Sequence, residues 1–292
     1  MEVVVRGRAI ALMGAAGLLV AGAATGGWYD AGDYLKFTHT TAYGDIVLYA
    51  AERALGGASP STLDSEAHFG TKWLSQMWDQ RTKTSLYAMA DLNPGQLVTA
   101  LPYAFYPEDT WRDDMELGAT ELALAAQALH KNATPYLTDA ANFAKGYIAS
   151  DGGDTFNLYD TSALAHADLT KALAAAGNPS VAVTKAQLVA DLKHQVQTGA
   201  TRAATDIFHA GGVYGDFDVD SHTFGLLATQ ALYKQASGDA SFDGFATQQR
   251  NWLFGANAWG ASFMVGEGTS YPKCMQHQIS NIAHSSAVGA DQ

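Results

Sequence analysis

The sequence predicts an all-α protein, and three observations support this fold class. Apolar residues recur at helical spacing in one segment after another, as in DDMELGATELALAAQALH, where Met115, Ala119 and Leu122 fall in register. The connections between these segments are rich in Gly, Asp and Asn, as in GGDTFNLYD at residues 152–160. Strand signals are few. This pattern predicts helical hairpins in series, which a bundle, a solenoid or a toroid of paired helices would satisfy.

The elements follow in order along the chain. The first expected helix is periodic and rich in alanine, and the second places Leu63, Ala67 and Leu74 on one face. Ser221, after Asp220, is expected to cap the seventh helix. Gly238 suits the left-handed position after that helix. The eight expected helices span residues 39–55, 63–79, 113–130, 136–150, 161–177, 185–208, 221–238 and 242–255. We find no fixed sequence period, which weighs against a simple repeat solenoid.

Composition narrows the classes of partner. The chain has 292 residues, 17 Lys+Arg against 29 Asp+Glu, and a formal net charge of −12. This acidic balance argues against a nucleic-acid surface and against anionic membranes, and it is compatible with a neutral or cationic substrate. Cys274 is the only cysteine, so neither an intrachain disulfide nor a cysteine-based zinc site can form.

The first 24 residues resemble a secretory signal peptide. Arg6 and Arg8 precede an apolar run from Ala9 to Ala24, which is short for a membrane span of about 20 residues. A buried first helix and an uncleaved anchor are the competing interpretations. We expect the signal peptide, with residues 25–292 forming one catalytic-type domain in a secreted protein that has no membrane association once processed.

Two aspartates lie three residues apart in GGWYDAGDYLKF at residues 26–37. Neighbouring carboxylates such as Asp30 and Asp33 resist double ionisation and can together hold one water and remove its proton, as in an inverting sugar hydrolysis. Trp28 and Tyr29 before them offer ring faces that suit sugars. A turn whose aspartates cap backbone N–H groups is the structural alternative. A calcium loop would need more oxygen ligands than the stretch supplies.

A second cluster lies near the end of the chain, in ASFMVGEGTSYPKCMQHQ at residues 261–278. We expect a strand-like Phe-Met-Val run that enters a Gly-Glu-Gly turn. Gln276, His277 and Gln278 follow, and their amide and imidazole groups suit the recognition of sugar hydroxyls. An ordinary surface loop is the alternative.

Two acidic stretches are interpreted as structural. In WRDDMELG, Asp113 and Asp114 fall in the first turn of a helix, where the helix dipole favours anions. In GDFDVDSH at residues 215–222, three aspartates precede a helix but lack the glycine and distal glutamate of an EF-hand, so we expect capping. The sequence implies no cofactor or metal, and calcium binding is left open.

Taken together, these stretches resemble glycoside hydrolase family 9, the inverting cellulases of (α/α)6-barrel fold. GGWYDAGDYLKF is similar to the family's N-terminal signature, and SFMVGEGTSYPKCMQHQ has the spacing of its later one. Four further segments match in the same order: YPEDTWRDDMELGATELALA, NLYDTSALAHADL, FDVDSHTFGLLATQALY and FATQQRNWLFGANAWG.

The resemblance implies a function and roles for named residues. The reaction would be inverting hydrolysis of β-1,4-glucosidic bonds in cellulose or a related β-glucan, of endoglucanase type. Asp33 would be the general base, and Asp30 would help to hold the water. Trp28 and Tyr29 would lie near the cleaved sugar, and the loop carrying Gln276, His277 and Gln278 would bind hydroxyls there.

The chain also departs from the family pattern. Gln276 and Gln278 stand where the family signature has His and Arg, and we find no counterpart of the family's general-acid glutamate after them. Glu267 is the best internal substitute. Eight expected helices in place of twelve predict a shortened, incomplete barrel, whose open helix faces self-association could cover. The alternative function is that of a glucan-binding protein without catalysis, or of an inactive fragment.

Overall fold

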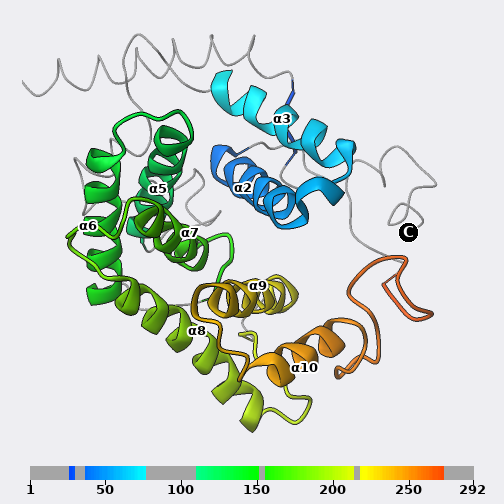
Figure 1. Ribbon diagram of the computed structural model, residues 1–292. Helices are drawn as coiled ribbons and strands as arrows, with labels where there is room; N and C mark the ends of the chain where they lie inside the picture. Colours follow the sequence, from blue (N-terminus) through cyan, green and yellow to red (C-terminus); the bar gives the residue numbers. More distant parts are fainter. Residues whose placement is uncertain (1–25, 30–36, 77–109, 151–154, 214–217, 273–292) are drawn as a thin grey trace, which may run out of the picture. The chain divides into compact units, whose positions relative to one another are not determined.

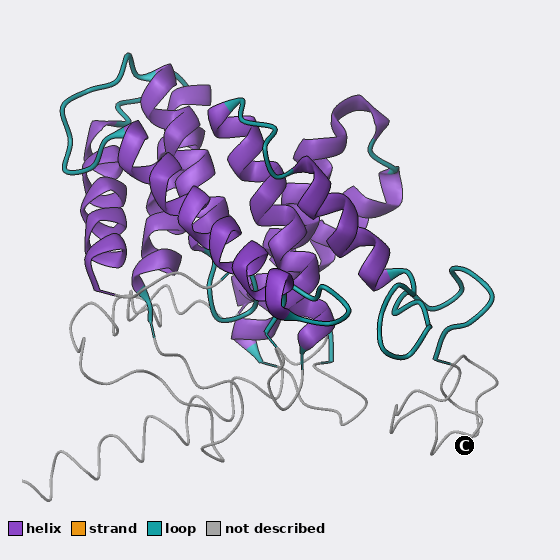
Figure 2. Cartoon of the chain, turned by 90° about the horizontal axis from the view of Figure 1, so that it is seen from below, coloured by secondary structure: helices purple, strands orange, loops and turns teal. Residues whose placement is uncertain are grey.

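The computed structural model describes residues 26–29, 37–76, 110–150, 155–213 and 218–272. These residues form eight α-helices and one short 3-10 helix (Figure 1). Figure 2 shows the helices joined by loops, with no strand in the described part of the chain. The all-α prediction is therefore confirmed for these residues. The expected signal peptide at residues 1–24 lies outside them.

The chain divides into two compact units, one formed by residues 1–88 with 273–292 and the other by residues 89–272. The described helices of the first unit are α2 (Thr38–Leu55) and α3 (Ser61–Gln76), joined by the 3-10 helix Gly56–Ala58. The two helices pack against each other as a hairpin. Asp45 of α2 accepts a hydrogen bond from Thr71 Oγ1 of α3 at 2.7 Å, which ties the pair together.

The second unit contains six described helices that pack in chain order. Helix α5 contacts both α6 and α7, α7 contacts α8 and α9, and α9 also contacts α8 and α10. Helices that follow one another along the chain therefore pack side by side, as expected for hairpins in series. The helices are α5 (Arg112–Ala128), α6 (Thr134–Ser150), α7 (Ser162–Ala175), α8 (Lys185–Thr205), α9 (Val219–Ser237) and α10 (Asp243–Leu253).

The core of the second unit is built largely from small side chains. Alanines from α5, α6 and α7 alternate with a few leucines and lie almost fully buried. Small residues let the helix axes approach closely, while the leucines fill the remaining space. This core, to which α8 and two connecting residues also contribute, comprises Ala123, Ala126, Ala133, Leu137, Ala140, Ala141, Ala144, Leu169, Ala172, Leu173, Val183 and Leu188.

The helix ends test the capping predictions. Gly238 follows α9 with φ 77°, so its predicted left-handed role is confirmed. The predicted cap at Ser221 is wrong, because α9 begins at Val219 and Ser221 lies in its first turn. There its hydroxyl donates to the carbonyl of Asp218, the residue that precedes the helix. Thr184 and Gln187 form a reciprocal capping box at α8, satisfying two N-terminal donors.

The strand-like interpretation of the Phe-Met-Val run is also wrong. Residues 263–265 form bends and a turn. Apolar runs this short do not distinguish strand from loop by periodicity, and here the adjoining glycines decide the conformation. Gly266 and Gly268 have φ values of 87° and 81°, which confirms the predicted turn around Glu267. None of the helices in the described ranges combines the length and apolarity needed to cross a bilayer.

One glycine permits a very close approach between a loop and a helix. A β-carbon added at Gly225 of α9 would overlap the backbone carbonyl of Phe156. The same loop is held by a hydrogen bond from the Phe156 N–H to Thr229 Oγ1 at 3.2 Å. A backbone atom cannot move aside as a flexible side chain can. The position of the loop at residues 155–161 therefore requires glycine at position 225 of α9.

We therefore predict that Gly225→Ala lowers the free energy of unfolding by about 1–3 kcal/mol, because the loop must move off α9. Urea unfolding followed by circular dichroism measures the change. Gly118→Ala is the matched control, since Gly118 lies in helix α5 with no atom within 4 Å of an added β-carbon. The control should stabilise the protein, as alanine is the better helix former. Equal effects at the two positions would contradict the role assigned to Gly225.

Candidate active site

The structure describes two of the seven residues that the sequence places at the site. Trp28 and Tyr29 are described, whereas Asp30, Asp33 and the loop with Gln276, His277 and Gln278 lie outside the described residues. The roles assigned to those five therefore remain predictions. The segment that leads into Asp30 is held through the side chain of Trp28.

The indole of Trp28 is anchored against α2 and α3. Its Nε1 donates to Glu66 Oε1 of α3 at 2.6 Å, and its ring lies 6.1 Å from that of Phe69. A charge-assisted hydrogen bond of this length is strong for its class. The two contacts fix both the position and the rotation of the ring.

Glycines create the space that the indole occupies. A β-carbon at Gly70 of α3 would overlap the Trp28 ring, and one at Gly44 of α2 would lie 3.8 Å from it. The same added carbon at Gly70 would stand only 2.8 Å from Asp45 Oδ1. Burial raises the pKa of Asp45, although its bond from Thr71 opposes the shift. A larger residue at position 70 would therefore disturb both Trp28 and this buried carboxyl.

The two predicted aromatic residues thus differ in setting. Trp28 is partly buried and engaged with Glu66, whereas the side chain of Tyr29 is 50% exposed. Of the two, Tyr29 has the more exposed side chain. The contact predicted between Trp28 and a sugar remains a prediction.

A pocket of about 270 Å³ lies beside this segment. Two aromatic rings and two long polar side chains line it, a combination that suits a small polar ligand with an apolar face. Its lining residues are Gly26, Phe69, Lys72, Trp73 and Gln76.

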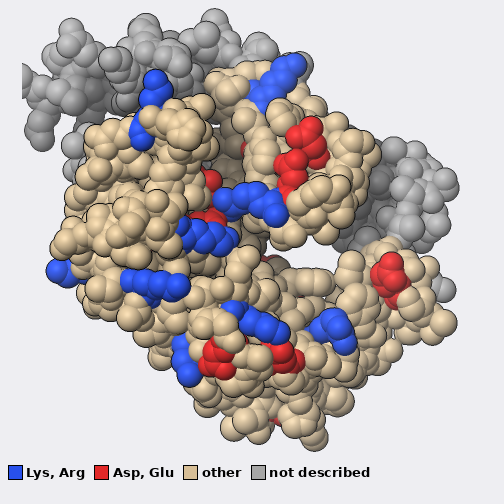
Figure 3. All heavy atoms as spheres, in the orientation of Figure 1, with Lys and Arg blue, Asp and Glu red and all other residues tan. Residues whose placement is uncertain are grey.

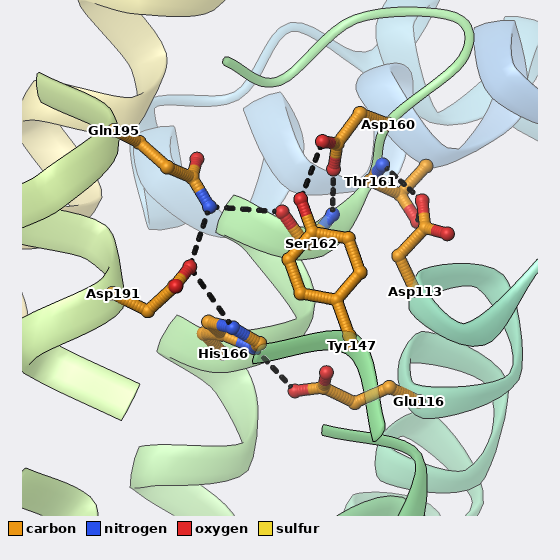
Figure 4. Close-up of polar contacts among 9 residues, drawn as sticks. All are labelled: Asp113, Glu116, Tyr147, Asp160, Thr161, Ser162, His166, Asp191 and Gln195. Carbon is orange, nitrogen blue, oxygen red and sulfur yellow. Dashed lines mark hydrogen bonds and ion pairs between the residues drawn. The ribbon is translucent and has the colours of Figure 1, made fainter. Parts of the chain in front are cut away.

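The second unit holds a buried charged cluster at its centre (Figure 4). His166 of α7 lies between two carboxylates, with Nδ1 2.7 Å from Glu116 Oε1 of α5 and Nε2 3.4 Å from Asp191 Oδ2 of α8. The side chains of His166 and Glu116 are fully buried. The cluster therefore connects three helices through two fully buried side chains and the largely buried Asp191.

Two carboxylates decide the charge of this histidine. Burial by itself lowers the pKa of His166, but Glu116 and Asp191 outweigh it and raise the pKa to about 10. Burial raises the pKa of Glu116, with His166 opposing the shift. For Asp191 the bonds from His166 and Gln195 outweigh burial, so its pKa falls. His166 is thus a cation at neutral pH, stabilised from both sides.

Hydrogen bonds extend the cluster toward the start of α7. Gln195 Nε2 donates to Asp191 Oδ2 at 3.0 Å and to Ser162 Oγ at 2.9 Å. The backbone N–H of Ser162 donates to Asp160 Oδ1 at 2.9 Å, and the Tyr147 hydroxyl donates to Asp160 Oδ2 at 2.6 Å. Figure 4 shows this chain of contacts running from α8 to the loop before α7.

Asp113 attaches the same loop to α5. Its Oδ2 accepts from the backbone N–H of Thr161 at 2.7 Å and from the Thr161 hydroxyl at 3.3 Å. The prediction that Asp113 and Asp114 lie in a first helical turn is confirmed. Beyond the helix dipole, Asp113 is buried and contacts the loop. Burial and then Asp113 raise the pKa of Asp160 to about 7.

This buried cluster fits a structural role. His166 and Glu116 have no exposed surface, so a substrate could not reach them without opening the core.

In the described ranges, no group of three His, Cys, Asp or Glu side chains is arranged to hold a metal ion. On the face seen in Figure 3, Lys and Arg side chains are scattered and gather into no basic patch.

The model of glycosyl hydrolase family 9 matches residues 17–93 and, in an overlapping second segment, residues 82–291. The chain belongs to this family. No curated protein and no solved structure matches the chain.

Membership in glycosyl hydrolase family 9 confirms two predictions. The family resemblance drawn from the motifs is correct, and the all-helical hairpins agree with the family's (α/α)6 fold. Family 9 membership also supports, in general terms, a glycoside hydrolase of cellulase type acting on glucans. The predicted incompleteness of the barrel stays a prediction.

Sequence reasoning missed the cluster around His166. NLYDTSALAHADL matches the family in the sequence, but no role is predicted there for the histidine that stands among its alanines and leucines. The signal was the position of His166 on the apolar face of a helix, since a buried histidine requires a partner. Its partners Glu116 and Asp191 are 50 and 25 residues away in the chain, so helical periodicity could not identify them.

We predict that the free energy of unfolding decreases as the pH rises from 6.5 to about 10. The folded state keeps the His166 proton over this range while the unfolded state loses it, so the stabilisation is complete below pH 6.5 and lost above 10. One such proton contributes a slope of about 1.4 kcal/mol per pH unit. Urea unfolding at several pH values should show a flatter slope for His166→Gln. Gln197→Ala, at an exposed position of α8, changes no titratable group and should keep the slope of the native protein.

We also predict that Gly70→Ala destabilises the hairpin of α2 and α3 by about 1–3 kcal/mol, because the indole of Trp28 must leave its position. Near-ultraviolet circular dichroism would report the displaced tryptophan alongside unfolding. Gly57→Ala is the control, as no atom lies within 4 Å of its added β-carbon. An unchanged spectrum and stability for Gly70→Ala would contradict the packing described for Trp28.

Proposed function

We propose that this protein hydrolyses β-1,4-glucosidic bonds in cellulose or a related β-glucan, with inversion at the anomeric carbon and Asp33 as the general base. The observation that carries the proposal is the family 9 match, which runs from residue 17 to residue 291 and includes the Asp-Ala-Gly-Asp segment. The acidic net charge of −12 agrees with a neutral polysaccharide as substrate.

The anchoring of Trp28 supports this assignment. Its indole is held by Glu66 and by the space at Gly70, only two residues before Asp30. A general base must be held within hydrogen-bond reach of its water, and small displacements cost rate. A fixed Trp28 restrains the backbone from which the two aspartates follow.

In the proposed reaction, the Asp33 carboxylate removes a proton from a water that Asp30 helps to hold, and the water attacks the anomeric carbon opposite the leaving sugar. An inverting mechanism also needs a general acid to protonate that sugar's oxygen. Glu267, an exposed residue in a turn between two glycines, is the internal candidate that the sequence offers for this acid.

The substrate also sets the proposed location. Cellulose is an insoluble polymer that an enzyme meets outside the cell, which agrees with the signal peptide proposed for residues 1–24. Sugar hydroxyls would be bound by Tyr29 and by the loop of Gln276, His277 and Gln278, whose amides can both donate and accept.

We predict that Asp33→Ala reduces the release of reducing sugar from carboxymethyl cellulose by about 10²–10⁴-fold, because the water loses its base. Asp139→Ala, an exposed position on α6, is the matched control and should keep full activity. The first product observed by proton NMR should be the α-anomer, as inversion requires. Activity that survives Asp33→Ala would remove Asp33 from the mechanism, and unaltered turnover in Glu267→Gln would remove Glu267.

A glucan-binding protein without catalysis is the alternative function. It would release no reducing sugar, while soluble β-glucan would still raise the temperature of unfolding. That pair of results would replace the enzyme assignment.

A further inference from the structure

A tryptophan on the loop after α10 has an unusual exposure. The side chain of Trp259 is 59% exposed, although most large aromatic residues bury the greater part of their surface. An indole with both faces covered could not reach this value. At least one face of the Trp259 ring is therefore open to solvent.

The backbone that carries Trp259 is held firmly by one buried asparagine. Asn257 Nδ2 donates to the carbonyls of Trp252 and Ala261 at 2.7 and 2.8 Å. Its Oδ1 accepts from the N–H of Trp259 at 3.0 Å. A turn closes with Gly260 N–H donating to Asn257 O at 3.1 Å, at a positive φ of 59° that favours glycine. The exposed ring thus stands at the tip of an ordered turn.

Two further aromatic rings support the indole. Trp252 of α10 lies 6.2 Å away at an interplanar angle of 89°, and Phe263 lies 5.5 Å away at 69°. Trp252 is fully buried and belongs to the local core with Leu253 and Ala210. These edge-to-face contacts fix the ring, so little side-chain entropy remains to be lost when a ligand stacks on it.

The surrounding loop indicates what kind of ligand would fit. Residues 254–272 contain a single charged residue, Glu267, among Ser, Thr, Asn and Tyr. Phe254, Met264 and Val265 of the same loop are also partly exposed. A loop with one charged side chain, which is acidic, and several exposed apolar or aromatic side chains does not suit a phosphate or a nucleic acid. It suits a neutral ligand with one apolar face and a hydroxyl rim, which describes a pyranose ring.

We propose that Trp259 is a stacking platform for a glucose unit of a neutral β-glucan chain, a binding subsite carried by the second unit. This inference rests on the proposed function for the identity of the glycan. It extends that function by naming a further residue that holds the polymer.

The test measures binding without hydrolysis, using affinity electrophoresis of the full chain in gels containing barley β-glucan. All proteins carry Asp33→Ala so that the glucan is not digested. Trp259→Ala should weaken the retardation about tenfold in apparent dissociation constant, and Trp259→Phe should retain most of it, since the phenyl ring still stacks. Ile207→Ala is the matched control, a residue 86% exposed just after α8, and should bind as the parent protein does.

The outcomes separate this inference from the proposed function. Equal retardation of Trp259→Ala and its parent would overturn the platform, whatever the activity of the native chain on carboxymethyl cellulose. A chain without hydrolytic activity whose binding still depends on Trp259 would keep the platform and refute the enzyme. Sedimentation of both proteins decides the remaining case: if Trp259→Ala dissociates a dimer, the face binds a second copy of the chain and the platform is wrong.

Discussion

The buried cation at His166 is the interaction on which the second unit depends. A charged imidazole without water is costly, and only the carboxylates of Glu116 and Asp191 make it tolerable. Because these groups come from α5, α7 and α8, none of the three helices can shift without leaving a buried charge unpaired. Alanine-rich packing alone would permit several registers of one helix against another, whereas the ionic contact is satisfied by one.

The hydrogen bonds that continue from this cluster also fix the loop at residues 155–161. Through Gln195 and Ser162 they reach Asp160, and Asp113 binds the adjoining Thr161. The loop at residues 155–161 is thus held from α5, α6 and α8, while Gly225 lets α9 approach it from another direction. A connection that looked like an ordinary Gly/Asp/Asn-rich linker is one of the most constrained segments described.

Trp28 and Trp259 differ in the packing around their rings, and this difference separates their proposed roles. Trp28 belongs to the signature that led to the family, and it lies against α2 and α3 with its nitrogen bound to Glu66. The sequence predicts no role for Trp259, yet its ring is the more exposed of the two and stands on a turn held by hydrogen bonds. Both residues are flat aromatic groups in loop segments. Only the packing around them separates a positioning residue from a candidate binding surface.

Sequence alone determined the local elements and the family. Apolar periodicity located all eight described helices, and Gly238 marked the end of α9, because these are properties of neighbouring residues. The segment with Asp30 and Asp33, together with the further segments that match in the same order along the chain, identified family 9. Two local predictions were wrong. The Phe-Met-Val run forms bends and a turn because of the glycines beside it, and Ser221 is not the cap because α9 begins earlier, at Val219. Tertiary structure alone decided that His166 is a buried cation and that Trp259 is exposed, since charge and burial arise from partners distant in the chain.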